Sequence, residues 1–301
     1  MESRDSEKIW TITELIGWSS AYLKEKGFED ARLNAELLLC HTLNYKRIDL
    51  YTKFDKPLTN TELALYKSYF KRRLDHEPLQ YIIGEARFMG LKFKVDKRVL
   101  IPRQETEILV EQVINKCRNF EGQINILDIG VGSGNIAVSL AKFIENALVT
   151  AIDISTGALE VAKLNIENNN VSDRVELINH DIFDKLNLNK KFDIVVSNPP
   201  YISKQEFKEV SADVSRYEPR LATTDGCDGL TYYRRIADVS RSILNNIGNV
   251  FVEIAYNQNE DVTRIFSEMG YVNLETVKDY SGNHRVVKAE WNIDACTYSA
   301  C

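Results

Sequence analysis

The chain has 301 residues, of which 44% are hydrophobic and 27% are charged, the composition of a globular protein that buries a substantial core. No apolar run approaches the roughly 18 residues that a membrane-spanning helix needs, and the acidic start lacks the apolar stretch of a secretion signal. The net charge of −6 gives no overall electrostatic footprint for nucleic acid. These properties predict a cytoplasmic protein that acts neither at a membrane nor on nucleic acid.

The cysteines and histidines give no sign of a metal centre. Neither residue type shows the close Cys/His spacing of metal ligands, and an odd number of widely separated cysteines gives no disulfide framework. We therefore expect no metal, and reduced thiols at all five positions, which are Cys40, Cys117, Cys227, Cys296 and Cys301.

Residues 1–84 are predicted to form a small helical domain. Apolar residues recur there at helical spacing in segments that begin near residues 9, 30, 50 and 59, and no strand-like stretch separates them. Gly27 is suited to end the first segment, and Thr59 or Asn60 can cap the last one. A helical bundle is the simplest arrangement of such segments.

The pattern changes between residues 78 and 103. Residues 78–84 lead into the segment 86–95, whose turn glycines and alternating second half favour a β-hairpin over a helix. Pro102 restricts the residue before it to extended geometry, so the following stretch should continue in extended form. We expect residues 85–103 to be a hairpin that links two domains.

Residues 104–291 are predicted to form an α/β domain of Rossmann-like class. Apolar runs at 124–129, 148–154, 175–177, 194–196 and 250–254 alternate with mostly amphipathic stretches. This alternation indicates a mainly parallel sheet with helices on both faces. Residues 292–301 carry no recognisable signal and are treated as a tail.

A glycine-rich turn follows the first of these apolar runs. Asp128 precedes Gly130, Gly132 and Gly134, which alternate with other residues at the start of a predicted helix. Glycines there permit unusual backbone angles and let a ligand approach the main chain. Asp153 ends the next predicted strand, where a carboxylate can accept hydrogen bonds from both hydroxyls of an adenosine ribose.

Two cofactors compete for this pattern. Residues 132–137 match the dinucleotide fingerprint G-x-G-x-x-A, which favours NAD. Asp128 argues against NAD, because a carboxylate beside the turn would repel a pyrophosphate but would suit the cationic methionine end of S-adenosylmethionine. After the following strand, Asp181 could accept a hydrogen bond from the adenine amino group, with Ile182 against the ring.

The segment Asn198-Pro199-Pro200-Tyr201 is the most informative in the chain. Two prolines often do no more than end a strand, but here they stand at the carboxyl end of a predicted sheet strand, where open α/β sheets bind ligands. An amide or exocyclic amino nitrogen is a weak nucleophile because its lone pair is delocalised. The Asn198 side-chain oxygen and the Pro199 carbonyl can accept hydrogen bonds from the two N–H groups of such a nitrogen. These bonds direct its lone pair toward a methyl donor.

Tyr201 completes the predicted substrate site. Its ring can stack on the planar amide, while the prolines hold the carbonyls in place at little entropic cost. The predicted catalytic residues are thus Asn198, Pro199 and Tyr201, with Pro200 as a further contact to the substrate.

With both loops placed, the sequence resembles the protein-(glutamine-N5) methyltransferases that modify peptide-chain release factors. The resemblance covers nearly the whole chain and is carried most specifically by the segments 100–107, 225–230 and 278–285. It implies S-adenosylmethionine as cofactor and the glutamine of the release factor's Gly-Gly-Gln tripeptide as substrate. It also implies that the helical domain helps to dock this partner, and we expect the enzyme to act as a monomer.

The resemblance also maps cofactor binding onto the chain, where it joins the residues inferred from chemistry. The resulting cofactor site consists of Asp128, Gly130, Val131, Gly132, Ser133, Gly134, Asp153, Ile154, Asp181, Ile182 and Asn198. Three positions depart from the family pattern: Gln104 stands where proline is usual, Val131 where threonine is common, and Ile182 where an aromatic residue is frequent. None of these changes removes a charged or hydrogen-bonding group that the mechanism needs.

Three alternatives remain at the level of sequence. A related enzyme that methylates a glutamine of a ribosomal protein would carry the same catalytic loops. A DNA or RNA adenine-N6 methyltransferase could present its amino group to the same turn, although the acidic balance and the lack of a basic, aromatic-rich segment disfavour it. A protein that binds its partner without catalysis is disfavoured by the intact Asn198 and Asp153.

Overall fold

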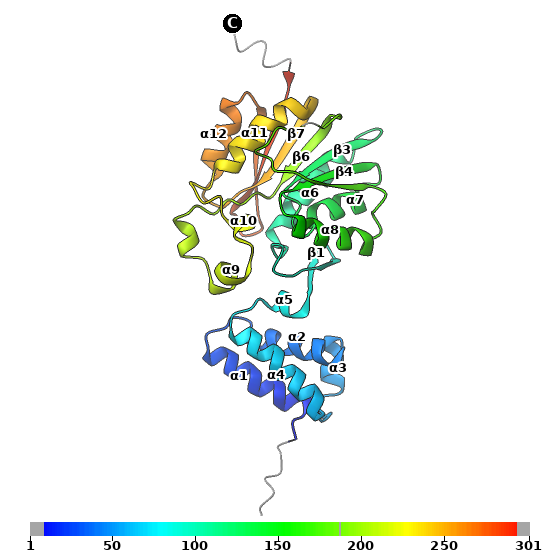
Figure 1. Ribbon diagram of the computed structural model, residues 1–301, viewed down its shortest axis with the longest axis vertical. Coiled ribbons are helices and arrows are strands. Elements are labelled where there is room, and N and C mark those ends of the chain that lie inside the picture. Colours follow the sequence, from blue (N-terminus) through cyan, green and yellow to red (C-terminus); the bar gives the residue numbers. More distant parts are fainter. Residues whose placement is uncertain (1–8, 187, 294–301) are drawn as a thin grey trace, which may run out of the picture. The chain divides into compact units, whose positions relative to one another are not determined.

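The computed structural model describes residues 9–186 and 188–293 (Figure 1). The chain divides into two compact units, Met1–Gly84 and Glu85–Cys301, which are described separately. Among the described residues, no helix combines the length and the apolar character that crossing a membrane requires.

All the elements that the structure describes between residues 9 and 84 are helices. They are α1 (Ile12–Glu25), α2 (Ala31–Leu43), α3 (Arg47–Thr52), α4 (Asn60–Leu74) and α5 (Leu79–Ile83). Helices α1 and α4 each begin with a capping box, in which Thr11 or Thr59 exchanges hydrogen bonds with the glutamate three residues later. Their buried faces share one core that includes Leu15, Leu39 and Tyr66.

A short helix precedes the predicted hairpin. Residues 79–83 form α5, which Gly84 ends in a left-handed conformation at φ 76°. Pro78 occupies the N-cap, where its missing N–H costs nothing, and its carbonyl accepts the N–H of Ile82. A short apolar run of this length does not distinguish a helical turn from a strand. The hairpin itself follows as β1 (Glu85–Phe88) and β2 (Leu91–Lys94).

The hairpin is integrated into the second unit. The side chain of Asn165 on α8 (Thr156–Asn168) accepts the Lys94 N–H at 2.6 Å and donates to the Lys94 carbonyl at 2.9 Å. The same amide donates to the Ser133 carbonyl in the glycine loop at 2.8 Å. The hairpin therefore supports the glycine loop and is not a free-standing linker.

The second unit is built on a seven-stranded sheet in the order β5-β4-β3-β6-β7-β9-β8. Its strands are β3 (Ile124–Ile129), β4 (Ala147–Asp153), β5 (Val175–Asn179), β6 (Phe192–Ser197), β7 (Leu244–Glu253), β8 (Val272–Lys278) and β9 (His284–Trp291). The first five strands in this order are parallel, which confirms the predicted α/β class with a mainly parallel sheet. The antiparallel strands β8 and β9 were not anticipated from the sequence.

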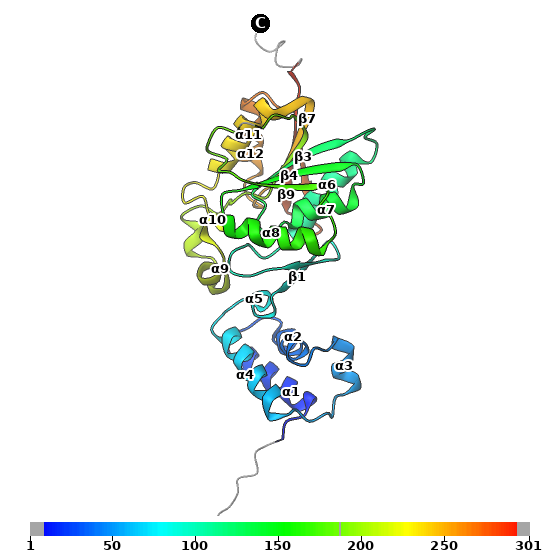
Figure 2. The same cartoon turned by 45° about the vertical axis from the view of Figure 1, so that its right-hand side comes forward.

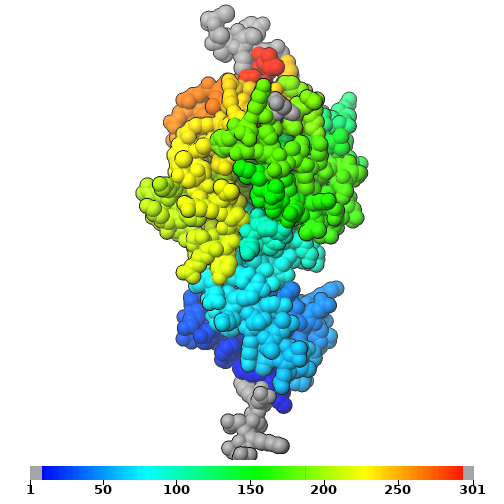
Figure 3. All heavy atoms as spheres, in the orientation of Figure 1, coloured from blue at the N-terminus to red at the C-terminus, as the bar shows by residue number. Residues whose placement is uncertain are grey.

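Helices cover both faces of this sheet (Figures 1 and 2). On one face pack α6 (Glu105–Cys117), α7 (Asn135–Phe143) and α8, and on the other α11 (Thr231–Ile243) and α12 (Asn259–Glu268). Three short helices lie between β6 and α11 along the chain: η1 (Glu206–Lys208), α9 (Ala212–Tyr217) and α10 (Arg220–Thr223). In Figure 3 the green atoms of the middle of the chain lie beside the yellow atoms of the segment that follows these short helices, on one face of the unit.

The described cysteines carry free thiols, as expected: Cys40 and Cys117 are buried and Cys227 is exposed. Cys296 and Cys301 lie outside the described residues, as does most of the predicted tail at 294–301.

Candidate active site

A cavity of about 300 Å³ opens at the carboxyl ends of β3, β4 and β6. This edge of a parallel sheet is where open α/β folds bind ligands. The predicted site residues that line the cavity are Gly130, Val131, Gly132, Ser133, Asp153, Ile154, Asp181, Ile182, Asn198, Pro199 and Pro200. The structure thus brings the glycine loop and most of the Asn-Pro-Pro-Tyr segment into one site.

Three predicted residues do not line this cavity: Asp128, Gly134 and Tyr201. The Asp128 side chain is fully buried, and its contact with a cationic ligand stays a prediction. Burial raises the pKa of Asp128 to about 7, although a hydrogen bond from the backbone N–H of Ala137 in α7 lowers it. A β-carbon at Gly134 would come within 3.3 Å of Ala162, so this glycine serves the close approach of two helices.

The glycine loop has the backbone that its sequence predicts. Gly130, Gly132 and Gly134 all adopt positive φ angles, of 82°, 52° and 80°. The Gly132 N–H donates to Oδ2 of Asp153 at 2.9 Å, and the Ser155 N–H donates to Oδ1 at 2.9 Å. Asp153 therefore fixes the loop, and its oxygens retain further lone pairs toward the cavity.

The loop after β5 supplies the apolar wall of the cavity. Ile182 is buried, and the neighbouring Asp181 accepts the Phe183 N–H through Oδ1 at 2.9 Å. From α11, Nε of Arg235 donates to the Ile182 carbonyl at 2.7 Å and holds this turn in place. Sequence reasoning missed Arg235, because nothing local connects it to a loop 53 residues earlier.

The Asn198 amide has a defined orientation. Its Nδ2 donates to Oγ1 of Thr106, the second residue of α6, at 3.1 Å. Just before it, Oγ of Ser197 donates to the Ile129 carbonyl at 2.7 Å, which ties the end of β6 to the end of β3. Since Nδ2 faces Thr106, Oδ1 is the end of the amide available to accept a hydrogen bond from a substrate.

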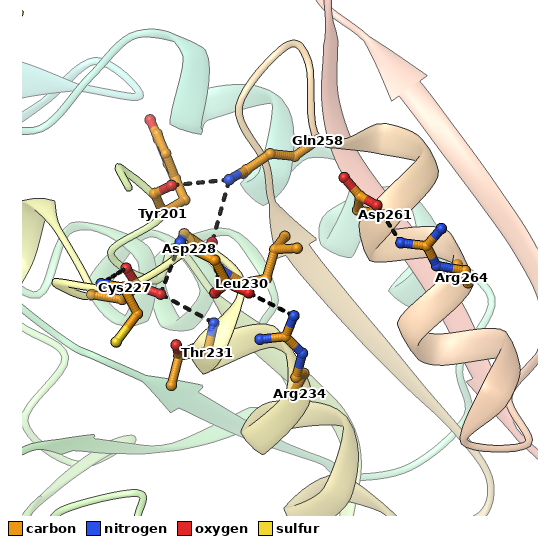
Figure 4. Close-up of polar contacts among 11 residues, drawn as sticks. Tyr201, Cys227, Asp228, Leu230, Thr231, Arg234, Gln258, Asp261 and Arg264 are labelled. Atoms are coloured by element: carbon orange, nitrogen blue, oxygen red, sulfur yellow. Dashed lines mark hydrogen bonds and ion pairs between the residues drawn. The ribbon is translucent and has the colours of Figure 1, made fainter. Parts of the chain in front are cut away.

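Tyr201 is anchored at both its side chain and its main chain. The hydroxyl donates to Oε1 of Glu253 at 3.4 Å, and burial raises the pKa of this phenol. Gln258 reaches toward the Tyr201 main chain, and its Nε2 donates to the Tyr201 carbonyl at 2.9 Å and to the Gly229 carbonyl at 3.3 Å (Figure 4). These contacts fix the position at which the reactive loop leaves the cavity.

An ion pair joins two further walls of the cavity. Nη2 of Arg103 lies 2.7 Å from both carboxylate oxygens of Glu218, whose side chain is almost fully buried. Their neighbours Pro102 and Pro219 both line the cavity. The sequence gives no sign that Arg103 and Glu218 pair across 115 residues.

Two family models match the chain. Residues 14–84 match the PrmC N-terminal domain, and residues 104–216 match the methyltransferase small domain. The first match lies within the helical unit and the second includes the glycine loop and the Asn-Pro-Pro-Tyr segment.

Similar proteins extend over nearly the whole chain. A release factor glutamine methyltransferase of Geobacter sulfurreducens is 42% identical over 283 residues, which cover 94% of this chain and 98% of the relative. One from Rhodopirellula baltica is 36% identical over 298 residues, covering 96% and 99%. The crystal structure of a methyltransferase from Pyrococcus furiosus matches with a TM-score of 0.50 and 21% identity over 68% of this chain and 91% of that one, which supports the fold.

Proposed function

Because the chain belongs to the family of release factor glutamine methyltransferases, we propose that it methylates the side-chain amide nitrogen of the glutamine in the Gly-Gly-Gln tripeptide of peptide-chain release factors. The observation that carries this proposal is the meeting of the glycine loop, Asp153 and Asn198 around one cavity. An S-adenosylmethionine site and a planar-nitrogen site are thereby adjacent.

The residues present fit S-adenosylmethionine. The glycine loop offers a close approach to the main chain, and Asp153 keeps lone pairs that can accept the ribose hydroxyls. Ile154 and Ile182 line the cavity and offer apolar surface to the adenine. The cofactor supplies an activated methyl group on a sulfonium, so the protein needs no nucleophile of its own.

The reactive loop prepares the substrate nitrogen. Oδ1 of Asn198 and the carbonyl of Pro199 accept the two N–H groups of the glutamine amide, so the lone pair is directed away from them. The same acceptors stabilise the positive charge that develops on nitrogen during transfer. They are held by the buried surroundings of Pro199 and by the contact of Asn198 with Thr106, and so need little reorganisation. The stacking role of Tyr201 stays a prediction.

The test is mass spectrometry of a release factor after incubation with the protein and S-adenosylmethionine. We expect one added methyl group, on the glutamine of the Gly-Gly-Gln tripeptide. A release factor with alanine in place of that glutamine is the matched control and should gain none. Methylation of duplex DNA or of a ribosomal protein, with no change in the release factor, would reject the proposed substrate.

We also propose that the helical unit contributes to docking the release factor. Ile48 and Phe54 in this unit are 64% and 56% exposed, and apolar side chains displayed in this way suit a protein partner. Ile48→Glu together with Phe54→Glu should raise KM for the release factor and leave S-adenosylmethionine affinity unchanged. An unchanged KM would show that Ile48 and Phe54 do not belong to the docking site.

The monomeric state, the absence of nucleic-acid binding and the cytoplasmic location stay predictions. Light scattering on the purified protein tests the first, and a binding titration with duplex DNA at low and physiological salt tests the second.

A further inference from the structure

We propose that the ion pair between Arg103 and Glu218 sets the position of the segment 203–222, and that this segment forms the wall of the cavity against which the Gly-Gly-Gln loop of the release factor binds. Glu218 is then a positioning residue, and the surface that it positions is a contact for the substrate. The inference rests on the proposed function, because it names a further part of the site that receives the release factor.

Two stretches of the cavity lining have no role in the reaction as described above. One lies within 98–103, ahead of α6, and the other is 219–222, which includes most of α10. The second stretch lies beside the reactive loop, because the N–H of Ile202 donates to the Thr223 carbonyl at 3.1 Å. Leu221 lines the cavity and is nevertheless 68% exposed. An apolar side chain displayed next to the site of the substrate amide suits the main chain of a glycine-rich peptide.

The segment 203–222 is an excursion from the sheet that contains η1, α9 and the start of α10. Its two ends are joined where Ile202 and Thr224 form a parallel bridge, and Figures 1 and 2 show α9 standing away from the sheet. Glu218 is the only buried residue between positions 203 and 222, a stretch that the structure describes in full. Apolar packing therefore does little to fix where this segment lies.

The buried side chain of Glu218 makes a contact that can fix it. Both carboxylate oxygens lie 2.7 Å from Nη2 of Arg103, and the Glu218 side chain is 1% exposed where that of Arg103 is 36% exposed. Burial raises the pKa of Glu218, whereas the charge of Arg103 lowers it. Without the arginine, the carboxyl group would have to take up a proton or turn toward water. Either change removes the ion pair that holds the segment.

A displacement of Glu218 would reach the cavity directly. The next residue is Pro219, which lines the cavity and whose ring restricts φ, here −60°, so the wall follows the position of Glu218. The Arg220 guanidinium lies 5.2 Å from the centre of the Phe207 ring and so connects the two ends of the segment. The glycine loop is held separately, by Asp153. Loss of the ion pair should therefore weaken binding of the release factor and spare the methyl donor.

The primary test is Glu218→Ala, which removes the carboxylate without changing a residue that lines the cavity. We expect KM for the release factor to rise about 10-fold, with kcat within about threefold and the Kd for S-adenosylmethionine within about twofold of the parent. In Arg103→Lys, KM should rise no more than about threefold, because a single nitrogen makes both contacts in the parent. Glu209→Ala removes an exposed carboxylate of the same segment and is the matched control, with KM unchanged.

Trypsin tests the position of the segment without any substrate. Lys204, Lys208 and Arg216 are exposed cleavage sites within it. Below the melting transition, Glu218→Ala should be cut at these sites about fivefold faster than the parent, and Glu209→Ala should be cut at the parent rate.

Leu221→Ser separates the contact from its positioning. This variant keeps the ion pair and removes the apolar surface offered to the peptide, so KM for the release factor should rise severalfold while the rate of tryptic cleavage stays that of the parent. A double variant tests the pairing itself. Arg103→Ala combined with Glu218→Ala should raise KM no more than the larger of the two single substitutions.

The proposal is overturned if Glu218→Ala leaves KM within about twofold of the parent, if the Kd for S-adenosylmethionine rises as much as KM, if Glu209→Ala has the same effects, or if the two single substitutions are additive. Failure of the proposed function looks different. The parent protein would then add no methyl group to the release factor, while trypsin would still cut the segment faster in Glu218→Ala.

Discussion

The two sides of the cavity are constructed differently. On the cofactor side, three glycines at positive φ set the shape of the loop, and Asp153 holds it through backbone N–H groups. On the reactive side, side chains meet across the fold: Asn198 contacts Thr106 over 92 residues and Tyr201 contacts Glu253 over 52. One side is made largely from main chain within a short segment, and the other from buried polar side chains of distant elements.

This difference predicts two kinds of sensitivity. A loop made from main chain tolerates changes in neighbouring side chains, provided that the glycine angles are kept. A network of buried polar groups transmits the loss of any member to the others, because an unpaired buried group is costly. Substitutions on the reactive side should therefore reduce turnover, and those on the cofactor side should mainly change donor affinity.

The largest expected effect is that of Asn198→Ala. Removing the acceptor should lower kcat by about 10²-fold or more, the usual cost of losing one preorganised contact to a transition state. Single-turnover methylation of a release factor measures this loss, and calorimetry should find S-adenosylmethionine affinity changed much less. Near-normal turnover in this variant would show that Asn198 is not the acceptor.

Much of the cofactor side could be predicted because its information is local. Alternating glycines after an apolar run fix a turn, and an acidic residue at the end of the next strand follows from the repeating β–α unit. Asp128 shows the limit of this reasoning. Its place beside the turn was evident, but its burial depends on how α7 packs over the end of β3.

The support of the reactive loop could not be predicted. Thr106, Glu253 and Gln258 are ordinary residues in their own segments, and they acquire a role only when β6, β7 and α6 are brought together. For the same reason the order of β8 and β9 in the sheet escaped prediction, since alternation along the chain does not encode which edge a strand joins. Long-range pairing is decided by the whole core.

A smaller effect is expected at Gly229, which lies against the reactive loop. It adopts φ +81°, and a β-carbon there would come within 2.5 Å of the Tyr201 carbonyl oxygen and 2.9 Å of Nε2 of Gln258. Gly229→Ala should therefore displace Tyr201 and lower kcat roughly 10-fold. Gly226→Ala is the matched control, because Gly226 has a similar φ of +71° but nothing within 4 Å of its β-carbon position. Equal losses in both variants would assign the effect to backbone strain alone.

Asp153→Ala tests the cofactor side. Its loss removes the acceptor of the Gly132 N–H together with the expected contact to the ribose, so the Kd for S-adenosylmethionine should rise about 10-fold. At saturating donor, kcat should stay within about threefold of the parent. Asp153→Asn keeps one oxygen acceptor, so its Kd for S-adenosylmethionine should lie between those of the parent and Asp153→Ala. A large loss of kcat with unchanged Kd would contradict the separation of the two sides.

The smallest expected effect concerns the contribution of the buried Glu253 to the stability of the folded protein. Burial raises the pKa of Glu253 to about 7, although the charge of Arg285 lowers it. The folded protein therefore holds a proton that the unfolded chain releases near the ordinary glutamate pKa of about 4.3. This contribution to stability is complete below that value and is lost as pH rises through about 7.

Glu253→Gln cannot titrate, so between pH 5 and pH 8 its melting temperature should fall by a few degrees less than that of the parent. Asp128 titrates in the same range in both proteins and cancels from the comparison. A variant that is relatively more stable at pH 8 and yet turns over more slowly would show that the carboxylate serves the position of Tyr201 at the expense of stability. Parallel losses of stability and turnover would instead make Glu253 a structural residue.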